Sequence, residues 1–248
     1  MQATLDVPVM PPLPELKAAK AAPERSSLFR RVLQDRTALL GEIVAGKSHN
    51  LTRVALVGAA LTALGGLALG VSSPHPQQIL LAAVKTPLIA MGALLICFPA
   101  FYIFAVLQGS QLSMGKALRM FVVGMGLRGA IIAGLAPLLL FFSSVGSPYG
   151  FLLVAGLVTF GLAEAGFLHT LQAGVKQMRD AGDSISLAFT RGWMLIYLAV
   201  VMQFTWSLRP IIGLCNHEAD VCHWMLIGGG PGGNMFTHII SQVAKLVA

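Results

Sequence analysis

The sequence predicts an all-α membrane protein, a bundle of about five transmembrane helices with an amphipathic helix at each end. The first observation is composition: 56% of the residues are hydrophobic, 11% are charged and the mean hydropathy is +0.76. A soluble domain carries about 25% charged residues. The second observation is a set of five long apolar stretches, since a helix needs about 20 apolar residues to cross hydrocarbon about 30 Å thick. Backbone polar groups in lipid must be satisfied within the segment, which an α-helix achieves.

The chain before the first span divides into two parts. Residues 1–25 contain five prolines and predict a disordered segment. Residues 26–46 predict an amphipathic helix on the cytoplasmic side, with apolar residues at helical spacing and most charged residues elsewhere. These apolar residues are Phe29, Val32 or Leu33, Leu40 and Ile43. The helix could lie on the leaflet with its arginines near anionic headgroups, or it could pack on the bundle as an ordinary surface helix.

The five spans follow within residues 51–213. We expect them at about 51–71, 84–107, 117–142, 149–171 and 193–208. Lys and Arg near the ends of spans are retained in the cytoplasm. They occur before the first span, between the second and third, and between the fourth and fifth, whereas the other two connections carry none. This alternation places the amino terminus in the cytoplasm and everything after residue 208 outside. The segment before the first amphipathic helix lacks the apolar core of a cleavable signal peptide.

A cluster of cysteines and histidines follows the fifth span. Cys215, His217, Cys222 and His223 lie within residues 213–224. In a bacterial inner membrane this loop faces the periplasm, where thiol pairs are oxidised. A zinc site would need four ligands, and this order of ligands is not a standard zinc spacing. We favour a disulfide between Cys215 and Cys222, with the two histidines as solvated loop residues, and we expect no metal and no cofactor.

The chain ends with a second amphipathic helix. Residues 228–233 form a glycine-rich break, and Asn234 can cap a helix over residues 234–247. Its apolar stripe consists of Phe236, Ile239, Ile240, Val243 and Val247. The segment is too short to cross the membrane, so we expect it to lie along the periplasmic face or to dock into the bundle.

Four ionisable residues fall within or at the ends of the spans, where charge is costly and often functional. They are Lys85, Arg128, Glu164 and Arg209. Counted from the cytoplasmic ends of their spans, Arg128 and Glu164 differ in depth by only about 3 Å at 1.5 Å per residue, so they can form an ion pair. We favour a structural pair over a proton- or ion-coupled site. Lys85 and Arg209 are expected to reach the interface, with Arg209 capping its own helix before Pro210.

Small residues and prolines mark where helices approach or bend. Gly66 and Gly70 form a GxxxG match, which permits close backbone approach. Pro87, Pro99 and Pro137 are expected to kink or interrupt their helices. A single histidine, His169, could hold a haem or chlorin, although a lone histidine is more often an interface residue.

The residues also resemble a family. The stretch Leu-Ile-Cys-Phe-Pro in the second span, Leu-Arg-Pro-x-x-Gly after the fifth, and the closing Gly-Asn-Met-Phe helix are similar to a family of bacterial inner-membrane proteins. That family is loosely grouped with Yip1-type multi-span proteins and sometimes carries a misleading label as actin-binding WH2 domain-containing proteins. The similarity covers about residues 26–247. It supports the fold and implies no activity, and neither the cysteine loop nor the proline-rich amino terminus belongs to it.

These observations favour a non-catalytic role. The sequence contains no paired catalytic constellation and no P-loop. We therefore expect no enzyme and no nucleic-acid partner, but an inner-membrane subunit or scaffold that contacts lipids, other membrane subunits or a second copy of itself. The alternative is a small transporter or lipid-handling component that uses Arg128 and Glu164.

We predict that Cys215 and Cys222 are joined while Cys97, inside the second span, stays reduced. Non-reducing mass spectrometry of the peptide covering residues 210–224 should show a mass two hydrogens below that of the dithiol. Two free thiols together with bound zinc would contradict the disulfide.

Overall fold

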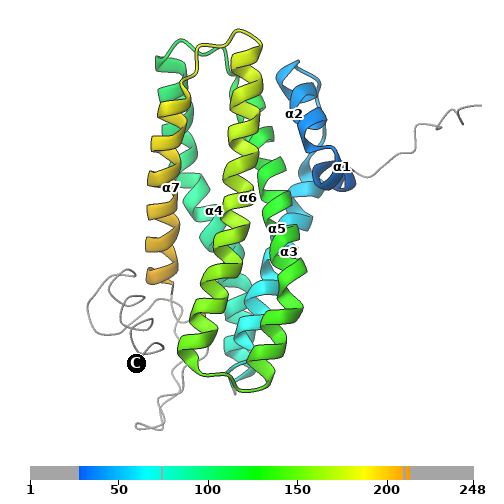
Figure 1. The fold of residues 1–248 in the computed structure, drawn as a ribbon, viewed down its shortest axis with the longest axis vertical. Helices are drawn as coiled ribbons and strands as arrows, with labels where there is room; N and C mark the ends of the chain where they lie inside the picture. The colour runs from blue at the N-terminus through cyan, green and yellow to red at the C-terminus, as the bar shows by residue number, and fades with distance from the viewer. Residues whose placement is uncertain (1–27, 74, 209–210, 213–248) are drawn as a thin grey trace, which may run out of the picture.

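The structure, a computed structural model, describes residues 28–73, 75–208 and 211–212, and these residues form helices joined by short connections (Figure 1). The helices are α1 (Leu28–Gln34), α2 (Arg36–Val44), α3 (Thr52–Gly70), α4 (Pro76–Leu107), α5 (Met114–Ser144), α6 (Tyr149–Asp180) and α7 (Leu187–Ser207). Five of them, α3 to α7, are long and apolar enough to cross a membrane. The predicted class, an all-α membrane protein with about five spans, is confirmed.

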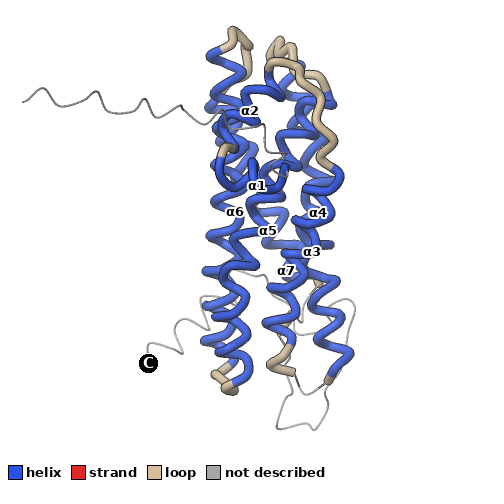
Figure 2. Tube along the Cα trace, turned by 90° about the vertical axis from the view of Figure 1, so that its right-hand side faces the viewer, coloured by secondary structure: helices blue, strands red, loops and turns tan. Residues whose placement is uncertain are grey.

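The five long helices form a closed ring of contacts. Helix α3 packs on α4 and α5, α5 packs on α6, α6 packs on α7, and α7 packs on α4. The tube in Figure 2 shows the same helices running side by side along one axis. Each of the five helices therefore has two neighbours in this ring, and α1 and α2 add contacts to α3, α5 and α6.

Capping residues explain where several helices begin. Ser113 and Ser186 precede α5 and α7, and their hydroxyls accept hydrogen bonds from the backbone N–H groups of Lys116 and Phe189. Helix α4 begins at Pro76, well before residue 84, where the second span was predicted to start. Proline suits the first turn of a helix because its missing N–H group would have no partner there.

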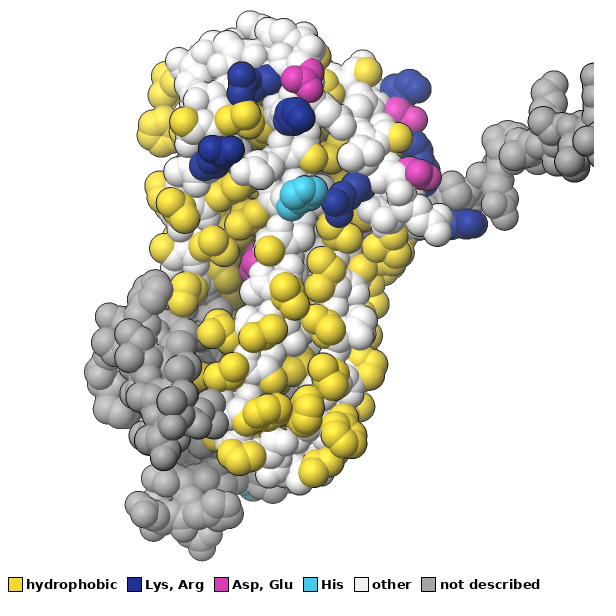
Figure 3. Space-filling model, in the orientation of Figure 1, with side chains coloured by type: hydrophobic (Ala, Val, Ile, Leu, Met, Phe, Trp, Pro, Cys, Tyr) yellow, Lys and Arg dark blue, Asp and Glu magenta, His cyan; other side chains and the backbone are white. Residues whose placement is uncertain are grey.

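The helices differ in length in a way that sets the shape of the molecule. Helices α4 and α6 have 32 residues and α5 has 31, or about 47 Å at 1.5 Å per residue. Helix α3 has 19 residues and is about 28 Å long, close to the thickness of the hydrocarbon. The longer helices therefore extend past the start of α3 at one end. Charged side chains gather at that end, and the remainder of the visible face is mostly apolar (Figure 3).

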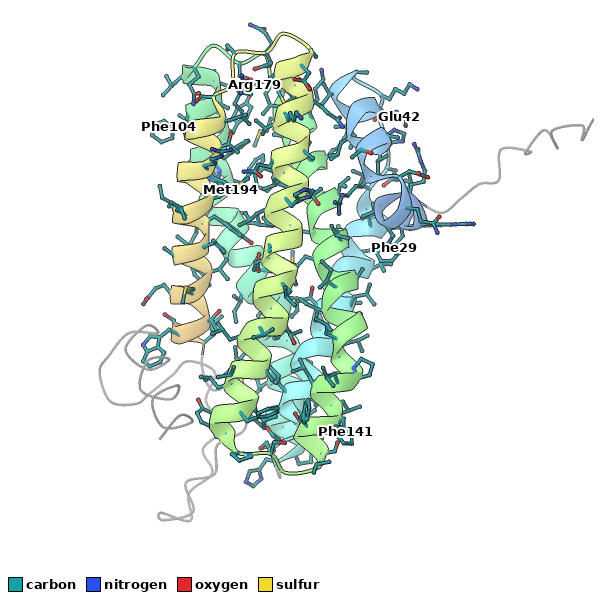
Figure 4. The ribbon with its side chains drawn as sticks, in the orientation of Figure 1. Phe29, Glu42, Phe104, Phe141, Arg179 and Met194 are labelled. Atoms are coloured by element: carbon teal, nitrogen blue, oxygen red, sulfur yellow. The ribbon has the colours of Figure 1, made fainter. Side chains whose placement is uncertain are left out.

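We call this end the charged end. It consists of α1, α2 and residue 35 between them, the first residues of α3 and α7, the adjoining turns of α4, α5 and α6, and the connections 45–51, 108–113 and 181–186. In Figure 4, Arg179 and Glu42 lie at the charged end and Phe141 lies at the opposite, apolar end. Apart from Lys85, Arg128 and Glu164, all charged residues that the structure describes belong to the charged end.

The predicted amphipathic helix is divided into α1 and α2 at Asp35. Helix α2 packs on α5 and α6, and Leu39, Leu40 and Ile43 are fully buried. Helix α1 is seen nearly end-on in Figure 1, so it lies across the axis of the bundle. Packing on the bundle, one of the two interpretations of the sequence, therefore describes α2.

An ion pair joins the two short helices. Nη2 of Arg31 lies 2.9 Å from Oε1 of Glu42, and Nε2 of His49 lies 3.0 Å from Oε2 of the same carboxylate. The hydrogen bond from Arg31 lowers the pKa of Glu42. This contribution to stability is present above the ordinary carboxyl pKa and is lost as the pH falls through the lowered pKa.

Glycines allow α3 to approach both of its neighbours. A Cβ atom on Gly66 would overlap the carbonyl oxygen of Ala82 on α4, and one on Gly70 would lie 2.8 Å from the Cα atom of Ile79. A Cβ atom on Gly129 of α5 would overlap the carbonyl oxygen of Gly58 on α3. The GxxxG match at Gly66 and Gly70 is thus a site of close helix contact, as predicted.

The prolines do not interrupt their helices. Pro87 and Pro99 lie inside α4, and Pro137 lies inside α5. Pro87 cannot donate to the carbonyl of Ala83. The hydroxyl of Thr86 lies 3.2 Å from the carbonyl oxygen of Thr62 on α3 and 3.4 Å from that of Ala83, so it can donate to either one. Of the two expected effects, an interruption is excluded and a kink stays a prediction; side-chain donors and neighbouring helices can sustain a helix through proline in a membrane bundle.

We predict that Gly66→Ala lowers the thermal stability of the purified protein in detergent, because the new methyl group meets backbone atoms of α4 that cannot move aside. Overpacking of this kind costs about 1–3 kcal/mol. The matched control is Gly161→Ala on α6, where a Cβ atom has no neighbour within 4 Å. The control should keep or raise the Tm, since alanine favours helix over glycine. Equal Tm values for the two variants would contradict close packing of α3 on α4.

Candidate functional site: a buried ion pair in the bundle

The structure brings Arg128 and Glu164 together, as the sequence predicted. Arg128 lies on α5 and Glu164 on α6, and Nε of the guanidinium lies 2.6 Å from Oε1 of the carboxylate. The two residues are 3% and 4% exposed. A hydrogen bond between two charged groups at this distance is of the strong kind. The pair therefore links two neighbouring helices in the interior of the protein.

The pair lies within the apolar part of the bundle. Helix α5 ends at Ser144 and helix α6 starts at Tyr149, and both of these residues lie at the apolar end. Counted from them at 1.5 Å per residue, Arg128 and Glu164 lie about 24 and about 22 Å from the apolar end. Both heights fall within a hydrocarbon layer about 30 Å thick that begins at that end. Helices α5 and α6 are antiparallel, so this register alone brings the charges level.

A third residue completes the site, and the sequence did not identify it. The hydroxyl of Tyr197, on α7, donates to Oε2 of Glu164 at 3.2 Å. Tyr197 is fully buried. Each carboxylate oxygen of Glu164 thus accepts a hydrogen bond from a different helix. A tyrosine in the interior of a span was an available signal, because a buried tyrosine hydroxyl usually finds a hydrogen-bond partner.

Aromatic rings fill the ring of helices next to the site. The ring of Tyr197 lies 5.3 Å from that of Phe167 and 5.5 Å from that of Trp193, measured between centroids. Trp193 also contacts Phe101 of α4 and Phe121 of α5, and its indole N–H donates to the carbonyl oxygen of Cys97 at 3.0 Å. These contacts join α4, α5, α6 and α7. They pack the interior beside the ion pair with large apolar groups.

The arrangement is suited to holding helices together. Removing one partner of a buried ion pair leaves an uncompensated charge in a medium of low polarity, which is strongly unfavourable. Among the described residues, no group of three His, Cys, Asp or Glu side chains is placed to hold a metal ion. The alternative use of the pair is a proton- or ion-coupled step, since Glu164 is an ionisable group inside the apolar part of the bundle.

Lys85 differs from the prediction. It lies in the first third of α4 and is 1% exposed. We expected its side chain to reach the interface, because the second span was predicted to begin at residue 84. Helix α4 begins at Pro76, which places Lys85 about 14 Å inside the helix. Its side chain is enclosed by the bundle, so that expectation is wrong.

His169 and Cys97 lie in well-defined surroundings. Nδ1 of His169 lies 3.2 Å from Nη2 of Arg36, the first residue of α2. This contact gives His169 a role between α6 and α2. Cys97 is buried in α4, as predicted, and forms no disulfide within the described residues; its reduced state stays a prediction.

Several predictions concern residues outside the described part of the chain. They are the disordered segment over residues 1–25, the capping role of Arg209, the disulfide between Cys215 and Cys222 with its solvated histidines, the glycine-rich break over residues 228–233, and the amphipathic helix over residues 234–247. Each of them stays a prediction.

No model of a protein family matches the chain, and no curated protein or solved structure matches it. The resemblance to Yip1-type proteins stays a prediction.

We predict that Arg128→Met destabilises the protein by about 3–5 kcal/mol, because it leaves the carboxylate of Glu164 buried without its cation. Tyr197→Phe removes one neutral donor and should cost only about 1–2 kcal/mol. Met at position 128 combined with Glu164→Met should recover most of the lost stability, since no unpaired charge remains. Thermal or denaturant unfolding in one detergent measures all three proteins. A double variant less stable than Arg128→Met would contradict this interpretation.

Proposed function

We propose that the protein is a non-catalytic subunit or scaffold of a larger protein assembly in the bacterial inner membrane, with its charged end in the cytoplasm. The observation that carries the proposal is the charged end itself. Three helices extend past the apolar part of the bundle, and two short helices pack on these extensions. A structured surface outside the membrane can present a fixed shape to another subunit.

The loops of the charged end are held in place by hydrogen bonds to one another. The carboxylate of Asp183 accepts from the backbone N–H of Gln111 at 3.1 Å. The hydroxyl of Ser184 donates to the carbonyl oxygen of Gln108, and the amide oxygen of Gln108 accepts from the N–H of Ser186, both at 2.9 Å. The connections 108–113 and 181–186 therefore form one rigid surface. Rigid surfaces bind partners at a lower entropic cost than flexible ones.

A shallow cavity of about 210 Å³ opens at the charged end. Its lining combines apolar side chains with a cation and an anion; it includes Val44, Leu112, Lys116, Met120, Met178 and Asp183. Nζ of Lys116 donates to the carbonyl oxygen of Val44 at 2.9 Å, which fixes the end of α2 beside the cavity. The cavity supports the assembly of this surface with another protein.

A second candidate is a small transporter or lipid-handling component. The buried pair of Arg128 and Glu164 favours it, because ionisable groups inside a membrane bundle often lie on ion or proton pathways. Both oxygens of Glu164 are engaged by other side chains, and large aromatic rings fill the adjoining interior. These two features favour the structural use of the pair.

Extraction from the native membrane in a mild detergent tests the proposal. We predict that the tagged protein copurifies with a partner at a fixed stoichiometry. Lys47→Glu together with Arg179→Glu, at exposed positions of the charged end, should reduce the amount of partner by at least tenfold. A matched control is Val158→Ala with Leu162→Ala, two exposed apolar residues on the lipid-facing part of α6.

Two outcomes would contradict the proposal that the protein is a scaffold. One is a protein that purifies alone, as a monomer, from every mild extraction. The other is a transport activity that Glu164→Gln abolishes while the Tm stays unchanged, which would favour the transporter.

A further inference from the structure

We propose that the charged end carries a binding surface for anionic phospholipids, formed by Arg36, Arg53 and Arg191 at the boundary between the apolar bundle and water. The ligand is the phosphate of an anionic phospholipid in the leaflet on this side. The inference deepens the proposed function, because it rests on the same placement of the bundle in a membrane.

The height of the basic residues defines the boundary. Arg53 lies on α3, His169 on α6 and Arg191 on α7, and the apolar ends of these helices are Gly70, Tyr149 and Ser207. Counted from Tyr149 at 1.5 Å per residue, His169 lies about 30 Å from the apolar end of α6. Arg53 and Arg191 lie in the first two turns of α3 and α7, at the charged end. The hydrocarbon of a bilayer is about 30 Å thick. Three helices thus place a basic or imidazole side chain where hydrocarbon gives way to headgroups.

Helix α2 adds a cation at the same height. Nη2 of Arg36 lies 3.2 Å from Nδ1 of His169, so the start of α2 is level with this part of α6. An imidazole carries no negative charge, so the charge of Arg36 is not balanced by His169. A phosphate oxygen would supply the missing negative charge.

The positive charge at this end exceeds the negative charge. The charged end holds ten Lys and Arg residues and four Asp and Glu residues. Within the described chain, neither Arg53 nor Arg191 has an acidic side chain at ion-pairing distance, and both are exposed. Guanidinium groups bind phosphate through paired hydrogen bonds and are weakly hydrated, which suits the headgroup layer.

Helix α1 lies at the same boundary. It runs across the bundle axis, and in Figure 4 Phe29 lies on the side of α1 that faces the apolar part of the bundle. Leu33 is 45% exposed. An amphipathic helix in this orientation lies in the plane of the interface, with basic residues among the headgroups. Leu33 on α1, together with Arg36 and Arg53 on the neighbouring helices α2 and α3, therefore fits one ligand, a lipid surface.

Anionic lipid is favoured over zwitterionic lipid by charge. A phosphatidylcholine headgroup brings its own cation close to these arginines, whereas phosphatidylglycerol does not. A basic residue near an anionic surface contributes about 1 kcal/mol, which corresponds to about fivefold in affinity. Arg36, Arg53 and Arg191 together should therefore produce a clear preference.

Native mass spectrometry of the full chain, purified in detergent and titrated with phosphatidylglycerol or phosphatidylcholine, tests the proposal without any protein partner. We expect tighter binding of phosphatidylglycerol. Arg36→Gln, Arg53→Gln and Arg191→Gln should each reduce this preference by about fivefold. The matched control is the set Lys47→Gln, Lys176→Gln and Arg179→Gln, which removes the same charge further from the boundary and should retain most of the preference. Measuring each arginine variant singly keeps the test valid if the triple variant does not fold.

Three results would overturn the proposal. One is equal binding of the two lipids by the unaltered protein. Another is an equal loss in the control set, which would show a general effect of net charge. The third is full displacement of phosphatidylglycerol by millimolar inorganic phosphate, which would show a small-anion site. A failure here leaves the copurification experiment unaffected, because that experiment measures a protein partner.

Discussion

The bundle depends on keeping the ion pair between Arg128 and Glu164 away from water and lipid. Each charge is tolerated in the interior only because the other lies 2.6 Å away. This requirement fixes the register of α5 against α6, since a shift of one turn would separate the charges by about 5 Å. Tyr197 extends the same constraint to α7 through the second oxygen of Glu164. Three helices are therefore held in one arrangement by a single carboxylate.

On the other side of the ring, glycines allow the helix backbones to come into close contact. Gly66 and Gly70 bring α3 against α4, and Gly58 and Gly129 bring it against α5. Lipid surrounds apolar side chains as favourably as another helix does, so close backbone contact supplies much of the packing energy in a membrane. Polar contacts therefore hold α5, α6 and α7 together, and close glycine contacts hold α3 against α4 and α5. The charged end extends from a bundle whose helices are held together on both sides.

Much of this architecture could be predicted from the sequence, because the length of the apolar stretches shows the spans and the position of a charged residue within a span shows its depth. Hydropathy located the five spans, and counting residues from their ends placed Arg128 level with Glu164. Tyr197 could not be paired in the same way, because hydropathy does not give the rotation of α7. The burial of Lys85 was missed because α4 starts at Pro76, and apolar windows do not register the polar first turn of a helix. The break at Asp35 was also not predicted; it separates α1 from α2, which packs on α5 and α6.

A depth profile along α6 tests the central claim, that the ion pair lies inside the hydrocarbon. Spin labels would be placed singly at Val158, Leu162, His169 and Lys176 in protein whose native cysteines are replaced, reconstituted in bilayers. Collision rates with oxygen and with a water-soluble nickel complex then locate the boundary. The account predicts that oxygen dominates at positions 158 and 162, that the nickel complex dominates at position 176, and that the crossover falls near position 169. A crossover on the apolar side of Glu164 would place the pair among headgroups or in water and would contradict it.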